Sequence, residues 1–260
     1  MNVSLDGRVA LVTGASKGLG LAMTRAFAEA GGSVAMLARG VEALDSAVAS
    51  LAEEGLTRVR AYPCDVSQAE AVAAVHSRVV ADLGTVDILV NNAGTSRTMP
   101  FASITDEDWQ VDLDLKLFAA IRLSRLVWPG MKVQRRGRII NVLNTLAKAP
   151  PAGSAPTSVS RAAGLALTKV MAGEGAPHNI LVNALLVGLI VSDQWVRKHA
   201  ATAPETPFDD FTRGLAKDVP LGRMGRPEEF ADLACFLASD RGSYITGTAI
   251  NVDGGRSPVP

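Results

Sequence analysis

The sequence predicts a doubly wound α/β fold, in which a parallel sheet carries helices on both faces. Short apolar runs alternate along the chain with longer segments of helical periodicity, the order that parallel strands and crossover helices require. Hydrophobic residues make up 48% of the chain, much of it Ala, Val and Leu, as expected of strands buried on both faces. A length of 260 residues suits one large α/β domain and is too short for two, so we expect a single domain over 1–260.

The individual elements follow from these patterns in chain order. Apolar runs of four to seven residues predict strands over 8–12, 33–37, 59–62, 86–90, 138–143, 180–186 and 248–252. Helical spacing between them predicts helices over 18–30, 41–54, 68–83, 105–131, 155–172 and 227–237. Thr105 with Asp108 three residues later predicts a helix N-terminal cap, and Pro227 suits a first helical turn. Residues 187–220 follow no clear pattern, and we expect an irregular, mobile loop insertion there.

Composition excludes several classes of function. The 26 basic and 26 acidic residues cancel, so no overall charge favours nucleic acid or an anionic membrane. Cys64 and Cys235 belong to no CxxC or Cys/His cluster, which argues against a disulfide framework or a zinc site. The sequence shows neither a signal-peptide pattern at its start nor a run of about 18 apolar residues. We therefore expect a cytoplasmic protein that acts on a small molecule.

A glycine-rich turn, TGASKGLG at 13–20, lies between the first predicted strand and the first predicted helix. Glycines allow a tight turn here and bring the backbone close to a pyrophosphate, while the helix start directs free N–H groups at the phosphates. The context between a strand and a helix is what makes a glycine trio informative. The turn predicts a dinucleotide site.

Further motifs give the chain a specific resemblance. The glycine-rich turn, Cys64-Asp65-Val66, NNAG at 91–94 and GTAINVDGG at 247–255 occur in the order and spacing of the short-chain dehydrogenase/reductase family, and the chain resembles its 3-oxoacyl-ACP-reductase-like members. The resemblance implies a Rossmann fold with a seven-stranded sheet, a cofactor along the carboxyl ends of the strands, and a homotetramer or homodimer. It implies that Asp65 contacts adenine and that the backbone of 92–94 lies near a ribose.

The expected cofactor residues combine the turn, these motifs and the segment after the sixth strand. They are Gly14, Ser16, Lys17, Gly18, Leu19, Gly20, Arg39, Asp65, Val66, Asn92, Ala93, Gly94, Arg161, Gly188, Ile190 and Ser192. Folds that prefer NAD place a carboxylate at the end of the second strand, where this chain has Ala38 followed by Arg39. Lys17 adds a second cation. Two cations without a carboxylate suit a 2′-phosphate, so we expect NADP(H) rather than NAD(H).

The catalytic positions depart from the family pattern. The family uses a Tyr-x-x-x-Lys pair, a Ser ahead of it and an Asn on the preceding long helix. This chain has no Tyr-x-x-x-Lys, since Val66 and Thr248 follow its two tyrosines at that spacing. Alignment of SRAA at 160–163 with the family's SKAA sets Thr157, Arg161, Asn144 and Lys116 at the Tyr, Lys, Ser and Asn positions.

These replacements change the chemistry that the site can perform. A Thr hydroxyl is far less acidic than a phenol of pKa about 10, and it stops roughly 4–5 Å short of the usual carbonyl position. Arg161 can bind a ribose but cannot release its proton, and Asn144 can still donate to a carbonyl. Lys116 or Lys148 is the candidate acid, because a nearby cation such as Arg161 and partial desolvation would together lower the pKa of a lysine towards the working range. Alternatively, Lys116 only neutralises Asp112 or Asp114, and Lys148 is a solvated loop residue.

The segment 187–220 is the expected substrate side. Ser192 keeps a hydroxyl near the expected carboxamide contact, and the Ile190 backbone can pair with that group. We expect residues 193–220 to form a mobile cover over the substrate, which we call the lid. Trp195, Phe208 and Phe211 either line an apolar pocket or dock this lid onto the body of the protein. His199 is either a third candidate acid or a surface residue of the loop. Three functions remain open: an NADP(H)-dependent oxidoreductase on a carbonyl/alcohol pair, a non-redox isomerase, dehydratase or lyase, and a non-catalytic NADP(H)-binding protein.

Overall fold

The computed structural model describes residues 3–260, and its centre is a seven-stranded parallel sheet in the order β3-β2-β1-β4-β5-β6-β7. The strands are β1 (Val9–Thr13), β2 (Ser33–Ala38), β3 (Val59–Pro63), β4 (Ile88–Asn91), β5 (Gly137–Asn144), β6 (Ile180–Val187) and β7 (Ala249–Val252). The doubly wound parallel sheet is therefore confirmed, with strand ends shifted by one or two residues. The strand order reverses between β1 and β4, the place where doubly wound folds bind their ligands.

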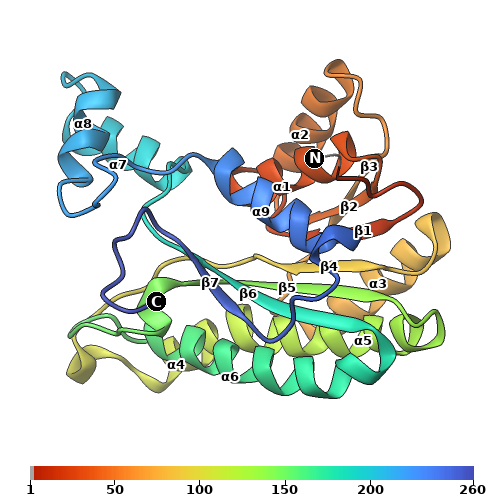
Figure 1. Cartoon of the computed structure of the whole chain (residues 1–260). Helices are drawn as coiled ribbons and strands as arrows, with labels where there is room; N and C mark the ends of the chain where they lie inside the picture. The colour runs from red at the N-terminus through yellow and green to blue at the C-terminus, as the bar shows by residue number, and fades with distance from the viewer. Residues whose placement is uncertain (1–2) are drawn as a thin grey trace.

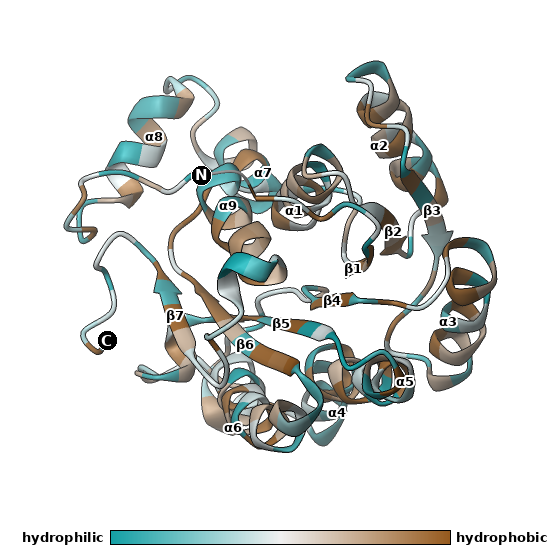
Figure 2. Ribbon diagram, turned by 45° about the vertical axis from the view of Figure 1, so that its right-hand side comes forward, coloured by the Kyte–Doolittle hydropathy of each residue, from teal (hydrophilic) through white to brown (hydrophobic). Residues whose placement is uncertain are grey.

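Helices cover both faces of the sheet (Figure 1). One face carries α1 (Gly18–Glu29), α2 (Val41–Glu53) and α9 (Pro227–Ala238), and the other carries α3 (Ala69–Leu83), α5 (Ala119–Val133) and α6 (Thr157–Gly175). Short 3-10 turns complete the chain: η1 (Phe101–Ser103), η3 (Thr145–Ala147), η4 (Ala176–His178) and η5 (Asp240–Gly242). Strands β1 and β4 are buried throughout, and their apolar side chains pack into a cluster on each face. Figure 2 shows this apolar band along the central strands.

The long helix expected over 105–131 is divided in three. It consists of α4 (Asp106–Leu113), the π-helical turn η2 (Asp114–Phe118) and α5. The cap at its start is confirmed, because the Thr105 hydroxyl accepts from the backbone N–H of Asp108 while the Asp108 carboxylate accepts from that of Thr105. A π turn inserts one extra residue into a helix and rotates the side chains that follow. Here the turn contains Lys116.

The prediction of an irregular segment over 187–220 is wrong. The segment contains α7 (Asp193–Thr202) and α8 (Phe208–Leu215), which lie together beside the carboxyl ends of the strands (Figure 1). Helix α8 has the apolar spacing Phe208, Phe211 and Leu215, and Pro207 lies at its N-terminal cap. In α7 the described side chains are at most partly buried, so few apolar residues marked it as a helix.

Cys64 and Cys235 are both buried and free. No helix within residues 3–260 combines the length and the apolar character that a membrane span needs.

Candidate active site

The predicted site residues gather at the carboxyl ends of the strands, on both sides of the point between β1 and β4 where the strand order reverses. The glycine turn follows β1, Asn92 to Gly94 follow β4, and Asn144 ends β5. Arg39 follows β2 and Asp65 follows β3, on the far side of β1. Parallel strands bring all these segments to one edge of the sheet. The sequence prediction therefore selected segments that the fold does bring together.

The glycine turn is shaped for close backbone approach. Gly14 has a φ of +64°, a conformation that side chains with a Cβ rarely adopt. A Cβ on Gly20 would lie 2.1 Å from the carbonyl oxygen of Gly14, so only glycine fits there. Lys17 stands at the N-cap of α1, where no side chain caps the helix. The first N–H groups of α1 therefore remain available for an anion such as a pyrophosphate.

Hydrogen bonds hold the glycine turn to the segment after β4. The Thr13 hydroxyl accepts from the backbone N–H groups of Asn92 and Ala93, each at 2.9 Å. The Asn92 amide donates to the carbonyl oxygen of Thr13 at 2.8 Å. These bonds fix the spacing between the phosphate-side turn and the segment expected beside the ribose.

The two expected phosphate cations are differently placed. Arg39 is exposed at the end of β2. Lys17 is about half exposed, and its Nζ lies 2.9 Å from a carboxylate oxygen of Asp193 at the start of α7. Asp65 accepts from the backbone and the hydroxyl of Ser67, which orients its carboxylate at the end of β3.

The expected reaction centre contains a buried hydrogen-bonded network. Lys116 Nζ pairs with Asp112 and donates to the Thr157 hydroxyl at 2.7 Å. The Ser160 hydroxyl donates to the other Asp112 oxygen at 2.6 Å and also reaches the Thr157 carbonyl oxygen at 3.1 Å. The backbone N–H of Arg97 donates to the Thr157 hydroxyl at 2.9 Å. The side chains of Lys116 and Asp112 are each 1% exposed.

The structure decides which carboxylate pairs with Lys116. Asp112 lies one helical turn before it, on the same face, whereas Asp114 pairs with Arg122 at 3.0 Å. Burial lowers the pKa of Lys116 to about 8, the Asp112 carboxylate opposes this shift, and the nearby Arg161 adds to it. Both expected causes, desolvation and the Arg161 cation, thus lower the pKa of Lys116, and burial is the larger of the two.

Arg161 and Asn144 retain unused polar groups. Arg161 donates from Nη1 to the Val142 carbonyl oxygen at 2.7 Å, while its buried Nε has no partner among the described residues. A Cβ on Gly94 would lie 2.5 Å from Arg161 Nη2, so this guanidinium lies against the segment expected near the ribose. Burial lowers the pKa of Arg161 to about 10. The Asn144 Oδ1 is also buried without a partner in the part of the chain described.

Other sequence candidates lie outside this network. The Lys148 ammonium donates to Ala249, Asn251 and Pro260 oxygens at 2.7–2.9 Å, so it ties β7 and the C-terminal segment to the loop after β5. With its ammonium held by three acceptors, Lys148 is neither a free candidate acid nor a solvated loop residue, contrary to both expectations. His199 Nε2 lies 2.6 Å from the Thr206 carbonyl oxygen.

The lid residues pack mainly within their own segment. The His199 ring packs against the rings of both Phe208 and Phe211, with centroids 5.3 and 5.1 Å away, and so joins α7 to α8. Trp195 packs against a small cluster that contains Leu189. For these side chains the structure supports docking of the lid.

The segment after β6 packs against the end of β7 and lines a cavity. Gly188 fits against Asp253, since a Cβ there would lie 2.3 Å from the Asp253 Cβ. Ile190 is buried and its backbone bridges to Gly225, while Ser192 is the N-cap residue of α7 and makes no side-chain cap bond. A cavity of about 520 Å³ lies along this segment, bounded by Ile190, Asn251 and Arg223 among others.

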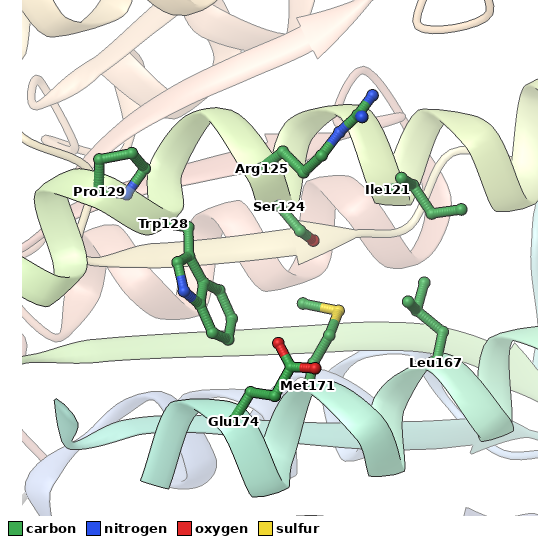
Figure 3. Close-up of a pocket in the computed structure, with 8 residues that line it drawn as sticks. All are labelled: Ile121, Ser124, Arg125, Trp128, Pro129, Leu167, Met171 and Glu174. Carbon is green, nitrogen blue, oxygen red and sulfur yellow. The ribbon is translucent and has the colours of Figure 1, made fainter. Parts of the chain in front are cut away.

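A second cavity, of about 270 Å³, lies between α5 and α6 (Figure 3). Trp128, Met171 and Leu167 line it together with Ile121, Ser124, Arg125, Pro129 and Glu174. It contains none of the predicted site residues and lies on a helix-covered face of the sheet. The predicted site residues lie instead at the strand ends.

Sequence reasoning missed Ser160 as a site residue and left Asp112 as one of two alternatives. The i, i+4 spacing of Asp112 and Lys116 was the available signal for the ion pair. Ser160 lay within the motif used for the alignment, but its bond to Asp112 joins two helices and has no local sequence signature.

Comparison with known proteins identifies the family. Residues 14–257 match the family model described as enoyl-(acyl carrier protein) reductase. The chain is 36% identical over 249 residues to an acetoacetyl-CoA reductase of Shinella zoogloeoides, covering 96% of this chain and 98% of the relative. It is also 36% identical over 257 residues to a 3-oxoacyl-[acyl-carrier-protein] reductase of Thermotoga maritima, with the same coverages.

The solved structures that resemble this chain include reductases and oxidoreductases as well. The L-sorbose reductase of Gluconobacter frateurii complexed with NADPH and L-sorbose superposes with a TM-score of 0.95 at 35% identity, covering 100% of both chains. An NADPH-bound short-chain oxidoreductase of Pseudomonas aeruginosa PAO1, described as containing an atypical catalytic center, superposes with a TM-score of 0.92 at 39% identity, covering 99% of both. By sequence and by structure, this chain belongs to the short-chain dehydrogenase/reductase family of oxidoreductases.

Proposed function

We propose that the protein is an NADP(H)-dependent oxidoreductase that interconverts a carbonyl and an alcohol, with Lys116 and Thr157 in place of the family's tyrosine as the source of the proton. The cofactor, when bound, supplies or accepts the hydride. The single observation that carries the proposal is the 2.7 Å hydrogen bond from Lys116 to the Thr157 hydroxyl.

The hydrogen bonds at Thr157 leave its own proton free. Its oxygen accepts two bonds, from Lys116 Nζ and from the Arg97 backbone, and no acceptor within residues 3–260 takes its O–H. An oxygen with both acceptor positions used can still donate. We infer that the substrate carbonyl lies deeper than in the usual family geometry, within hydrogen-bond reach of the shorter Thr157 side chain. Thr157 then donates its proton to the substrate oxygen as the hydride arrives at the carbonyl carbon, and Lys116 replaces that proton.

A lysine with a pKa near 8 suits this role. It is largely protonated at neutral pH yet can release a proton, which is what general acid–base catalysis requires. Lys116 then becomes neutral and loses part of its attraction to Asp112, while the substrate gains a hydroxyl. In the reverse direction, neutral Lys116 takes a proton from Thr157 as the alcohol gives up its own.

The residues present fit a phosphorylated dinucleotide. The turn at Gly14 and Gly20 provides a close backbone approach, and Lys17 and Arg39 provide cations at the two strand ends expected beside the adenosine. Arg161, placed against Gly94 with an unused Nε, would hold the nicotinamide ribose. The NH2 group of the Asn144 amide would donate to the substrate carbonyl, whereas its buried Oδ1, which has no partner among the described residues, can only accept. That the Pseudomonas aeruginosa relative binds NADPH and has an atypical centre supports a working enzyme without the usual residues.

One observation favours a second candidate, a non-catalytic NADP(H)-binding protein. Lys116 and Asp112 are each 1% exposed, and Thr157 is 2% exposed, so the network also stabilises the packing of α4 on α6. A role limited to packing would leave cofactor binding intact and turnover absent. The experiment must therefore separate binding from turnover.

The test has two stages. NADPH and NADH are first titrated by nicotinamide fluorescence, and we expect NADPH to bind more tightly. A panel of ketones, 3-oxoacyl thioesters and ketoses is then followed for NADPH loss and for alcohol formation, with Thr157→Val as the matched variant that keeps shape and loses the hydroxyl. We expect at least one substrate to be reduced, and Thr157→Val to bind NADPH normally but to lose most turnover.

Each stage can contradict the proposal. Failure to bind NADPH at millimolar concentration would remove both candidates. Binding without turnover would favour the non-catalytic protein. Equal rates for Thr157→Val and the natural chain would show that the hydroxyl carries no proton.

A further inference from the structure

One ion pair connects the lid helix α7 to the glycine turn. Lys17, immediately before Gly18, lies with its Nζ 2.9 Å from Oδ2 of Asp193, the first residue of α7. Both side chains are about half exposed, so solvent and ions can reach the pair. The ammonium expected to hold a cofactor phosphate is thus already paired with a carboxylate of the lid.

Asp193 has a second cation within its own helix. Arg197, one turn further along α7, directs Nη1 to the same Oδ2 at 3.5 Å. Lys17 makes no other ion pair in the part of the chain that the structure describes. If Lys17 leaves Asp193 for another anion, Asp193 still has Arg197 as an ion-pair partner. Lys17 itself then pairs with the new anion in place of Asp193.

We propose that Asp193 is a specificity-determining residue for the cofactor: it competes with the 2′-phosphate of NADP(H) for Lys17, so that binding of this phosphate releases the start of α7 from the glycine turn. The inference rests on the proposed binding of NADP(H), and it adds a coupling between the cofactor and the lid. NAD(H) has no 2′-phosphate and would leave the Lys17–Asp193 pair in place. Because coupling is reciprocal, weakening the pair strengthens NADP(H) binding.

Trp195 offers a reporter of the lid. It lies two residues after Asp193, packs on the cluster of Leu189, Ala216, Val219 and Met224, and has the Lys198 ammonium 5.3 Å from its ring centroid. Release of the start of α7 would change this environment. The oxidised cofactors do not absorb tryptophan emission, so they can be used without energy transfer.

The first test measures dissociation constants by calorimetry on the full chain. Asp193→Asn should tighten NADP⁺ binding about two- to fivefold, the effect of one exposed ion pair, and leave NAD⁺ binding unchanged. Asp209→Asn removes the same charge from an exposed position of α8 and should change neither constant. Arg197→Gln should weaken NADP⁺ binding, because Asp193 is left with Lys17 alone, and this effect should vanish in an Asp193→Asn background.

The second test follows tryptophan emission. NADP⁺ should shift the emission of the natural chain more than NAD⁺ does, and the difference should disappear in Trp195→Phe. Equal tightening of NADP⁺ and NAD⁺ by Asp193→Asn, or the same gain from Asp209→Asn, would reduce the effect to general charge and overturn the inference. If the natural chain binds neither cofactor, the proposed function fails as well, which distinguishes that outcome from a failure of the Asp193 competition alone.

Discussion

Lys116 and Thr157, which occupy two positions where the family pattern is broken, are joined to each other by a 2.7 Å hydrogen bond. They come from different helices, 41 residues apart in the chain. A threonine leaves empty much of the space that a tyrosine ring would fill, and the Lys116 side chain extends to its hydroxyl. The two replacements therefore form one unit, and a change at either position affects the other.

Replacing Lys116 with Met should reduce turnover about a hundredfold or more, since it removes the proposed proton source. It also leaves the buried Asp112 carboxylate without its cation, which should lower the free energy of unfolding by about 3–5 kcal/mol. Steady-state kinetics and chemical denaturation measure the two effects. Lys132→Met, at an exposed position of α5, is the matched control and should change neither.

Stability and turnover can be separated by a second substitution. Asp112→Asn in the Lys116→Met background removes the unpaired charge and should recover much of the lost stability, but none of the turnover. Recovery of turnover together with stability would mean that Lys116 acts only through packing.

The rate of reduction should depend on pH through Lys116. Its pKa is lowered to about 8, mainly by burial, and the protonated form is the proposed donor. The kcat/KM for reduction should therefore fall as pH rises through about 8, and that for alcohol oxidation should rise. A flat profile across this range, or one unchanged in Asp112→Asn, would contradict the assignment, because loss of the carboxylate should lower this pKa further.

Stability should respond to pH with a defined sign. Between about 8 and the ordinary lysine value of 10.5, the folded chain carries neutral Lys116 whereas the unfolded chain carries it protonated. The unfolded state then binds more protons, so this group makes the free energy of unfolding increase with pH across that window. Comparison of the natural chain with Lys116→Met/Asp112→Asn isolates the contribution from other groups.

Gly20→Ala should abolish or strongly weaken NADPH binding. The added Cβ would lie 2.1 Å from the Gly14 carbonyl oxygen, and because that contact is with backbone, the turn itself must deform. Gly173→Ala is the control, since a Cβ there meets nothing within 4 Å and glycine is a poor helix former. It should bind NADPH normally and be slightly more stable. Normal binding by Gly20→Ala would show that the cofactor does not depend on this turn.

The sequence predicted the sheet and the cofactor segments because both depend on local patterns. Apolar runs marked the strands, and the glycine turn stood between a strand and a helix. Helix α7 was missed because it buries little, so burial imposes no apolar period on its sequence. The partners of Asp193 and Lys148 were missed because their bonds join segments far apart in the chain, and no local pattern records such contacts. The single domain and the homotetramer or homodimer stay predictions.

The buried network also determines how the family's usual chemistry could be rebuilt. Thr157→Tyr with Arg161→Lys restores the Tyr-x-x-x-Lys pair in sequence, but Lys116 Nζ lies 2.7 Å from the Thr157 hydroxyl and leaves no room for a ring. Adding Lys116→Asn and Asp112→Asn clears that space without leaving a buried charge unpaired. We expect the fourfold variant to reduce ketones at least tenfold faster than the double variant, with NADPH oxidation as the measurement. The control for the cleared space is the Asp112→Asn/Lys116→Asn double variant without the other two substitutions, which should be inactive. Equal rates of ketone reduction in the fourfold variant and the Thr157→Tyr/Arg161→Lys variant would mean that Lys116 does not occupy the place of the missing ring.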